Sequence, residues 1–203
     1  MTTPFSVAIS AGGKSTRMGT DKALVDLNGK PVIERLLARV RDLGQAETIL
    51  IANRPEAYTH LGLPTFPDAL ADTGSLGGIY TAILRSQQPY TLVLACDMPF
   101  VNPDLLRHML SLRAGDQYDA IVPRVEGYPE GLHAVYSKAC LPPIRRRLDA
   151  DQLKVIGFYA DVRVRYLDEK EWQSFDPDGI SFYNVNTPDQ LEQARRLAQA
   201  HHE

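Results

Sequence analysis

Apolar residues along this chain of 203 residues fall into two alternating kinds of segment. Short, nearly continuous apolar runs predict strands that are covered on both faces of a sheet. Longer stretches with apolar residues at i, i+3 and i+4 predict amphipathic helices. The predicted strands span residues 5–9, 48–52, 91–95, 118–122, 133–136 and 162–167, and the predicted helices span 31–43, 76–86, 103–112, 137–148 and the region that begins at 188.

Polar residues and glycine mark the ends of several predicted helices. Asn102 and Thr187 each stand before a proline, a pattern typical of an N-cap followed by proline at the first helical position. Gly44 follows the apolar pattern of the first helix, as expected just past a helix end. Strands and helices that alternate at this spacing predict an α/β fold of three layers, a mostly parallel sheet with helices on both faces. Ligands of such folds bind where loops meet at the carboxyl ends of the strands.

Composition excludes several classes of function. The 22 Lys and Arg residues stand against 25 Asp and Glu, so nothing suggests the basic face that a nucleic-acid binder needs. Two cysteines, Cys96 and Cys140, are too few for a disulfide framework or a four-ligand zinc site. No apolar run approaches the ~20 residues that span a bilayer, and residues 1–5 show no signal-peptide pattern. We therefore expect a cytoplasmic protein without membrane or nucleic-acid partners.

The loop after the first predicted strand, residues 10–22, combines glycines with cations. Gly12, Gly13 and Gly19 let backbone amides approach a ligand closely, and successive amides form a nest for anions. Three cations, Lys14, Arg17 and Lys22, lie in the same loop. The pattern favours a polyphosphate site, whereas a basic, solvated surface turn is the alternative without function.

Gly13-Lys14-Ser15 also resembles the end of a Walker A loop. That motif requires glycine at position 8, where this chain has Ala8, and a helix directly after the serine. Gly19-Thr20-Asp21 interrupts before any helical pattern begins, so the sequence disfavours a P-loop NTPase.

Candidate metal ligands and amides follow two later segments. Asp97 stands in the loop 96–100, which directly follows the apolar run 91–95, and one carboxylate there together with substrate phosphates suits Mg²⁺; an Asx turn is the alternative. Asn184 and Asn186 alternate, so both amides face one side of an extended segment and could reach a metal or a phosphate, or cap the next helix. His133 lies between apolar residues, and we interpret it as a satisfied core residue, not a catalyst.

Taken together, these loops resemble the molybdenum cofactor guanylyltransferase family, nucleotidyltransferases of Rossmann-like fold that transfer GMP from GTP to molybdopterin. The matching pieces span nearly the whole chain. They are Ala11-Gly12-Gly13 with Ser15, Arg17-Met18-Gly19, Asp21-Lys22-Ala23-Leu24, Asn28-Gly29-Lys30-Pro31, Ala52-Asn53-Arg54, the Gly74, Leu76 and Gly78 pattern, Cys96-Asp97-Met98-Pro99-Phe100 and Asn184-Val185-Asn186-Thr187-Pro188.

The resemblance implies roles for individual residues. Lys22 would bridge the phosphates, Lys14 and Arg17 would hold the departing phosphates, and Asp97 would bind Mg²⁺, with Asn186 as a second candidate ligand. Lys22, Arg17 and Asp97 are thus the candidate catalytic residues. The candidate GTP-binding residues are Ser10, Ala11, Gly12, Gly13, Lys14, Lys22, Asn53, Asp68 and Asp97.

The expected substrates are GTP and molybdopterin, with Mg²⁺ as cofactor and other molybdenum-cofactor proteins or acceptor molybdoenzymes as candidate partners. We predict one nucleotidyltransferase domain over residues 1–203, with 1–102 mainly binding nucleotide and 103–203 mainly binding the acceptor. Two alternatives remain open: a cytidylyl or other nucleotidyltransferase that uses a different phosphate acceptor, and a nucleotide-binding module without catalysis.

Overall fold

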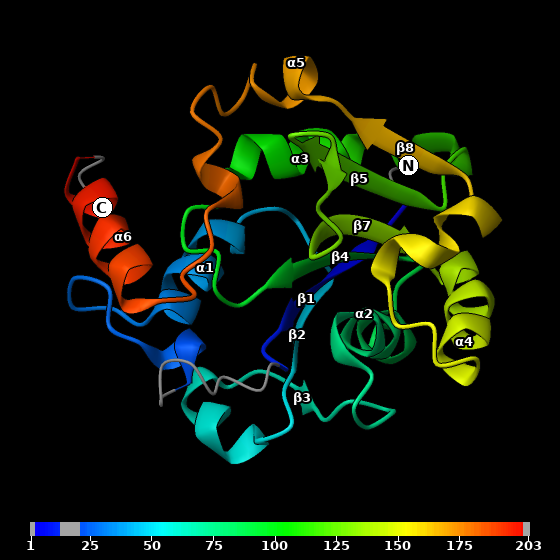
Figure 1. Ribbon diagram of the computed structural model, residues 1–203, viewed down its shortest axis with the longest axis horizontal. Coiled ribbons are helices and arrows are strands. Elements are labelled where there is room, and N and C mark those ends of the chain that lie inside the picture. Colours follow the sequence, from blue (N-terminus) through cyan, green and yellow to red (C-terminus); the bar gives the residue numbers. More distant parts are fainter. Residues whose placement is uncertain (1–2, 13–20, 201–203) are drawn as a thin grey trace.

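The computed structural model describes residues 3–12 and 21–200, whose strands form one sheet in the order β3-β2-β1-β4-β7-β5-β6, with β8 paired to β5 (Figure 1). The strands are β1 (Phe5–Ser10), β2 (Glu47–Ile51), β3 (Thr65–Phe66), β4 (Tyr90–Ala95), β5 (Ala120–Val125), β6 (Tyr128–Pro129), β7 (His133–Ser137) and β8 (Val164–Leu167). The α-helices are α1 (Val32–Val40), α2 (Gly74–Arg85), α3 (Pro103–Ser111), α4 (Leu141–Asp149), α5 (Glu169–Trp172) and α6 (Pro188–Ala200). Short 3₁₀ helices include η1 (Lys22–Leu24) and η5 (Val155–Asp161).

Strand directions make the sheet mixed. The pairs β1–β2, β1–β4, β2–β3 and β5–β8 are parallel, which agrees with the predicted mostly parallel sheet. β7 is antiparallel to both β4 and β5, and β6 is antiparallel to β5. A parallel crossover needs a dozen or more residues, and the connection of β5 to β7 through β6 is too short for one.

Side chains alternate across the sheet and divide the core into two layers. Val7 and Ile9 of β1 pack with residues of α1 and α3, whereas Ala8 packs with residues of α2 and α4 on the opposite face. Figure 1 shows these helices on the two sides of the sheet. The predicted arrangement of helices on both faces is therefore confirmed.

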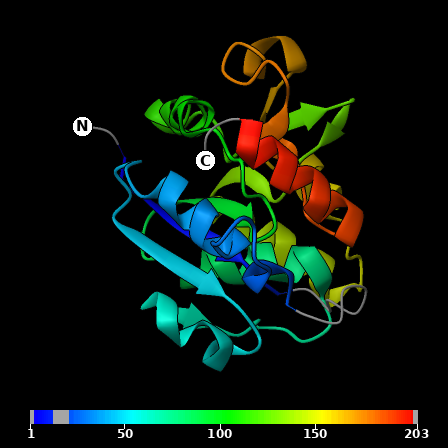
Figure 2. The same ribbon diagram turned by 90° about the vertical axis from the view of Figure 1, so that its left-hand side faces the viewer.

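A third, smaller apolar cluster joins α6 to the rest of the molecule. Val185 and residues of α6 pack against Leu27, Val32 and Phe100, and Figure 2 shows α6 on the side of the molecule that faces the viewer. This packing brings the segment before α6 next to the loops that follow η1 and β4. Within residues 3–12 and 21–200, no helix is long and apolar enough to cross a membrane.

The N-termini of α3 and α6 show whether the predicted caps form. Asn102 caps α3 through hydrogen bonds from the backbone N–H groups of Asp104 (2.8 Å) and Leu105 (3.2 Å), and Thr187 accepts a hydrogen bond from the backbone of Gln190 (3.2 Å). Both predicted caps are confirmed. The predicted helix 137–148 instead divides into a 3₁₀ turn (Lys138–Cys140) and α4. Two consecutive prolines, residues 142–143, lack N–H groups and are tolerated only in the first turn of an α-helix.

Candidate active site

A cavity of about 410 Å³ opens at the carboxyl ends of β1 and β4. The chain continues from β1 to β2 on one side of the sheet while β4 pairs on the other side, so the two following loops diverge at this point. Ligands of open α/β sheets bind at such a switch point, as the sequence predicted. The lining comprises residues 10–12, 21–22, 95–98 and 129–132, with Ser75, Val155, Asn184 and Asn186.

The backbone fixes the beginning of the first loop within this lining. The N–H of Cys96 donates to the carbonyl of Ser10 (3.0 Å), and the N–H of Ala11 donates to the carbonyl of Ile51 (2.8 Å). A Cβ atom on Gly12 would lie 3.2 Å from Asp68 Oδ2, while the backbone of Gly12 lies outside the left-handed region. Space beside Asp68, not the backbone dihedrals, therefore limits the side chain at position 12.

Lys22 enters the cavity from the start of η1, and Asp21 fixes that start. Asp21 Oδ1 accepts a hydrogen bond from the N–H of Ala23 (3.3 Å), while Oδ2 accepts from Tyr58 Oη (2.8 Å) and forms an ion pair with Arg54 (3.1 Å). Because Asp21 is held at both carboxylate oxygens, the backbone that carries Lys22 is fixed beside the cavity. The structure thus explains why an acidic residue precedes the candidate catalytic lysine.

Three of the predicted site residues converge in the cavity. Lys22 Nζ donates to Asn186 Oδ1 (2.5 Å), and its positive charge also acts on Asp97. Burial raises the pKa of the Asp97 carboxyl, and the Lys22 ammonium partly opposes that shift. The site therefore holds a cation, a carboxylate and an amide within one partly desolvated space.

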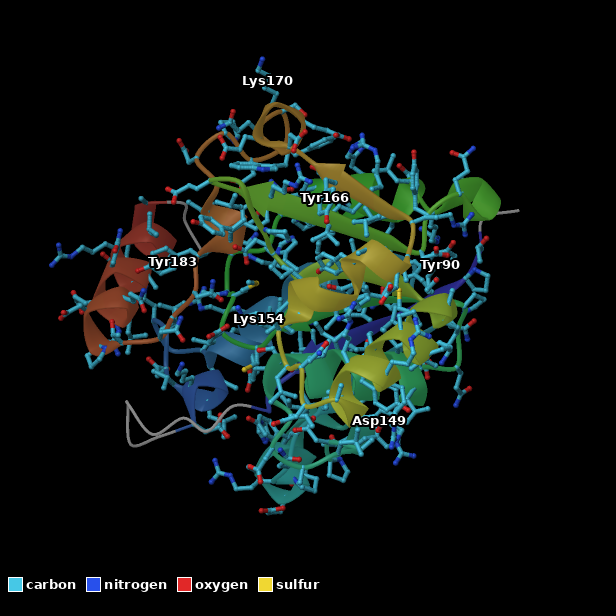
Figure 3. The ribbon with its side chains drawn as sticks, turned by 45° about the vertical axis from the view of Figure 1, so that its right-hand side comes forward. Tyr90, Asp149, Lys154, Tyr166, Lys170 and Tyr183 are labelled. Carbon is cyan, nitrogen blue, oxygen red and sulfur yellow. The ribbon has the colours of Figure 1, made fainter. Side chains whose placement is uncertain are left out.

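The segment 184–186 reaches the cavity because it is fixed from both sides. The N–H of Val185 donates to the carbonyl of Asp97 (2.9 Å), which joins the segment to the end of β4. Tyr183 Oη donates to the carbonyl of Gln190 (2.8 Å), and Figure 3 shows Tyr183 beside α6. Asn184 and Asn186 both line the cavity.

The protein oxygen atoms available in this site suit a metal ion that takes most of its ligands from water and phosphate. No group of three or more His, Cys, Asp or Glu side chains that could hold a metal occurs in the described part of the chain. Asp97 offers a carboxylate, whereas the side-chain oxygen of Asn186 already accepts a hydrogen bond from Lys22. One carboxylate fits Mg²⁺ that keeps several waters and takes further ligands from phosphate oxygens.

Asn53 and Asp68 form a unit beside the cavity and are not part of its lining. Asn53 Nδ2 donates to Asp68 Oδ2 (2.8 Å), and the N–H of Asp68 donates to Asn53 Oδ1 (2.9 Å). The pair supports the loop at Gly12, and its direct contact with nucleotide stays a prediction. Gly13, Lys14 and Arg17, the other predicted residues of the first loop, lie outside the described residues.

His133 and Cys96 have no role in the chemistry of the site, and His133 also differs in one respect from its sequence-based interpretation. His133 is fully buried, as predicted for a core residue, but neither ring nitrogen has a hydrogen-bond partner among the described residues, so the expectation of a satisfied histidine is wrong. Burial lowers its pKa to about 3, and its ring packs on Phe182 with centroids 4.8 Å apart. Burial also raises the pKa of the Cys96 thiol, which agrees with assigning it no chemistry.

One wall of the cavity consists of residues that are not among the predicted site residues. Residues 129–132 and Val155 form this wall, and Ser75 adds a hydroxyl from the first turn of α2. From the sequence, residues 127–131 have two interpretations, a loop that binds the acceptor or a simple hairpin turn. Val155 belongs to a 3₁₀ helix without helical periodicity, so no pattern marked it.

The fold and the cavity define a Rossmann-like α/β protein with an anion-compatible site at the switch point of its sheet. The sequence model of the MobA-like NTP transferase domain matches residues 7–162, so the chain belongs to this family. It is 40% identical over 191 residues to a probable molybdenum cofactor guanylyltransferase of Pelotomaculum thermopropionicum, covering 94% of this chain and 92% of the relative. A protein of Natranaerobius thermophilus with the same name is 36% identical over 200 residues, with 97% of each chain covered.

A solved structure agrees with this membership. The crystal structure of molybdopterin-guanine dinucleotide biosynthesis protein A from Archaeoglobus fulgidus superposes with a TM-score of 0.82 at 29% sequence identity. The match covers 96% of this chain and 99% of the other. The resemblance identified in the sequence and the predicted fold class are therefore confirmed.

Proposed function

We propose that this chain is a molybdenum cofactor guanylyltransferase that transfers GMP from GTP to molybdopterin and releases pyrophosphate, with Mg²⁺ as cofactor. The observation that carries the proposal is the convergence of Lys22, Asp97 and Asn186 in one cavity at the switch point of the sheet. Relatives at 36% and 40% identity that bear this enzyme name support the choice of reaction. The family membership favours a transferase over a binding module without catalysis.

The reaction is an in-line displacement at the α-phosphorus, in which positioning and charge neutralisation are the main requirements. The acceptor phosphate is already an anion near neutral pH, since its second pKa is about 6, so no general base is needed. Lys22 neutralises charge on the phosphates, and Asn186 orients its ammonium through the observed hydrogen bond. Residues 10–12 contact guanine and ribose through backbone groups. Asp97 would hold Mg²⁺, which supplies further charge neutralisation on the phosphate oxygens.

The direct test measures donor and acceptor specificity. Purified protein is incubated with molybdopterin and GTP, CTP or ATP, and pyrophosphate release and the dinucleotide product are quantified. The proposal expects product from GTP only, and loss of activity when EDTA removes divalent cations. Efficient transfer from CTP or ATP would indicate another transferase of the same fold. If none of the three donors released pyrophosphate, the chain would be a nucleotide-binding module without catalysis.

Asp97→Asn tests the metal ligand. The variant should lose about a hundredfold or more in transfer rate, because one charge is removed from the proposed Mg²⁺ site. Its melting temperature should not fall, since the substitution removes a carboxylate whose burial disfavours its charged form. Asp104→Asn, at an exposed position in α3, is the matched control and should leave the rate unchanged. Activity of Asp97→Asn near that of the control would refute the assignment.

A further inference from the structure

Among the described charged side chains that line the cavity, Glu130 differs from the others because it has neither a hydrogen-bond partner nor an oppositely charged neighbour. Asp21 is bonded to Arg54 and Tyr58, while Lys22 donates to Asn186 and acts electrostatically on Asp97. Glu130 also lines the cavity, on the wall formed by residues 129–132, and its carboxylate makes no hydrogen bond or ion pair with another described residue. Burial raises the pKa of Glu130 and is the sole resolved cause of the shift. A half-buried carboxylate without a partner is a group that a ligand could satisfy.

Buried contacts hold the backbone around Glu130 in place. The N–H of Glu130 donates to the carbonyl of Pro123 (2.9 Å), and its carbonyl accepts from the N–H of His133 (3.0 Å). At the next residue, Tyr136 Oη donates to the carbonyl of Gly131 (2.8 Å). The carboxylate therefore extends from a wall that backbone and side-chain hydrogen bonds hold in place.

The glycine in this wall is required by close packing. A Cβ atom at Gly131 would lie 2.6 Å from Val155 Cγ1 and 3.2 Å from Tyr159 Oη. Tyr159 Oη in turn lies 2.9 Å from Tyr136 Oη, so two buried phenols and η5 support the turn. Lys154, labelled in Figure 3, precedes this supporting helix. A wall that is packed this closely is suited to recognition with little ordering cost.

The proposed reaction assigns the two substrates to different parts of the cavity. In the proposed reaction, residues 10–12 contact the guanosine and the group of Lys22, Asp97 and Asn186 handles the phosphates. The wall at residues 129–132 is left for the ring of the acceptor. A pterin has a 2-amino-4-oxopyrimidine edge with two adjacent N–H donors, and a carboxylate can accept both.

We propose that Glu130 selects the acceptor by accepting hydrogen bonds from the amino and ring N–H groups of its pterin. This inference rests on the proposed guanylyltransferase function. A lumazine ring has an oxygen in place of the 2-amino group, so it would set a carbonyl oxygen against the carboxylate. A site built to bind a donor discriminates strongly against an analogue without it, because the buried acceptor is left unpaired.

The experiment compares two stable ring fragments on the intact protein. Pterin-6-carboxylate and lumazine-6-carboxylate are titrated by fluorescence into the native chain, Glu130→Gln and the control Glu126→Gln. Glu126 is an exposed glutamate in the turn between β5 and β6, outside the cavity lining. The native chain and the control should prefer the pterin by about tenfold or more, and Glu130→Gln should lose most of that preference.

Steady-state kinetics then assign the contact to the acceptor. In Glu130→Gln, KM for molybdopterin should rise about tenfold while the Kd for GTP stays within about twofold. A larger change in the Kd for GTP would place Glu130 on the donor base and overturn the proposal, as would equal values of every constant in the variant and the control. If the native chain bound pterin selectively but transferred no GMP, the proposed function would fail and the recognition by Glu130 would stand.

Discussion

The buried histidine of β7 gives a prediction about stability and pH. His133 is fully buried, and its two ring nitrogens have no hydrogen-bond partner among the described residues. Burial lowers its pKa from 6.5 to about 3 in the folded protein. Below pH 6.5 the unfolded chain therefore binds a proton on this histidine, while the folded chain does not until the pH approaches 3. Stability is lost as the pH falls through this window.

The magnitude follows from the two pKa values. Each pH unit inside the window lowers the free energy of unfolding by about 1.4 kcal/mol. The contribution of His133 to this free energy therefore falls by about 2 kcal/mol between pH 7 and pH 5. The full loss, below both pKa values, is on the order of 5 kcal/mol. His133→Leu removes the titrating group and places an apolar side chain against Phe182. Replacing an unpaired buried polar group by an apolar group of similar size is close to neutral at pH 7.

Urea unfolding at pH 7, 6 and 5 measures the effect. The free energy of unfolding of the native chain should fall by about 2 kcal/mol more than that of His133→Leu over this range. His60→Leu, the replacement of an exposed histidine in a 3₁₀ helix, is the control and should keep the pH dependence of the native chain. Identical pH dependence in the native chain and His133→Leu would show that His133 is hydrated or hydrogen-bonded in solution, and the reasoning would be refuted.

Three further variants test the site and the fold. Lys22→Ala should lower kcat by about a hundredfold with a change of less than about threefold in the Kd for GTP from calorimetry, because charge builds up on the phosphates in the transition state; a raised KM with unchanged kcat would contradict this. Gly12→Val should weaken GTP binding by more than about tenfold, since its Cβ would lie 3.2 Å from Asp68 Oδ2; unchanged affinity would mean that this loop is not the nucleotide site. Asn102→Ala should destabilise the protein by about 1 kcal/mol in urea unfolding through loss of the α3 cap, and no loss would contradict the capping role.

The sequence alone determined the parts of this protein that depend on local patterns. Continuous apolar runs identified the central strands β1 and β4, because both faces of these strands are covered by helices. The caps Asn102 and Thr187 were readable because a cap satisfies backbone groups only two or three residues away. Asp97 was identified because it follows the end of β4, and Asn186 because it alternates with Asn184 in the segment before α6.

The direction of β7 and the set of residues that lines the cavity depend on contacts between distant parts of the chain. An apolar run reports that a strand is buried, but the direction of pairing depends on the path of the chain between strands. Glu130 and Val155 line the same cavity although more than twenty residues separate them in the chain, and no local pattern records such proximity. The sequence also could not show that the ring nitrogens of His133 lack hydrogen-bond partners among the described residues, because the partners of a buried polar group come from packing between distant segments.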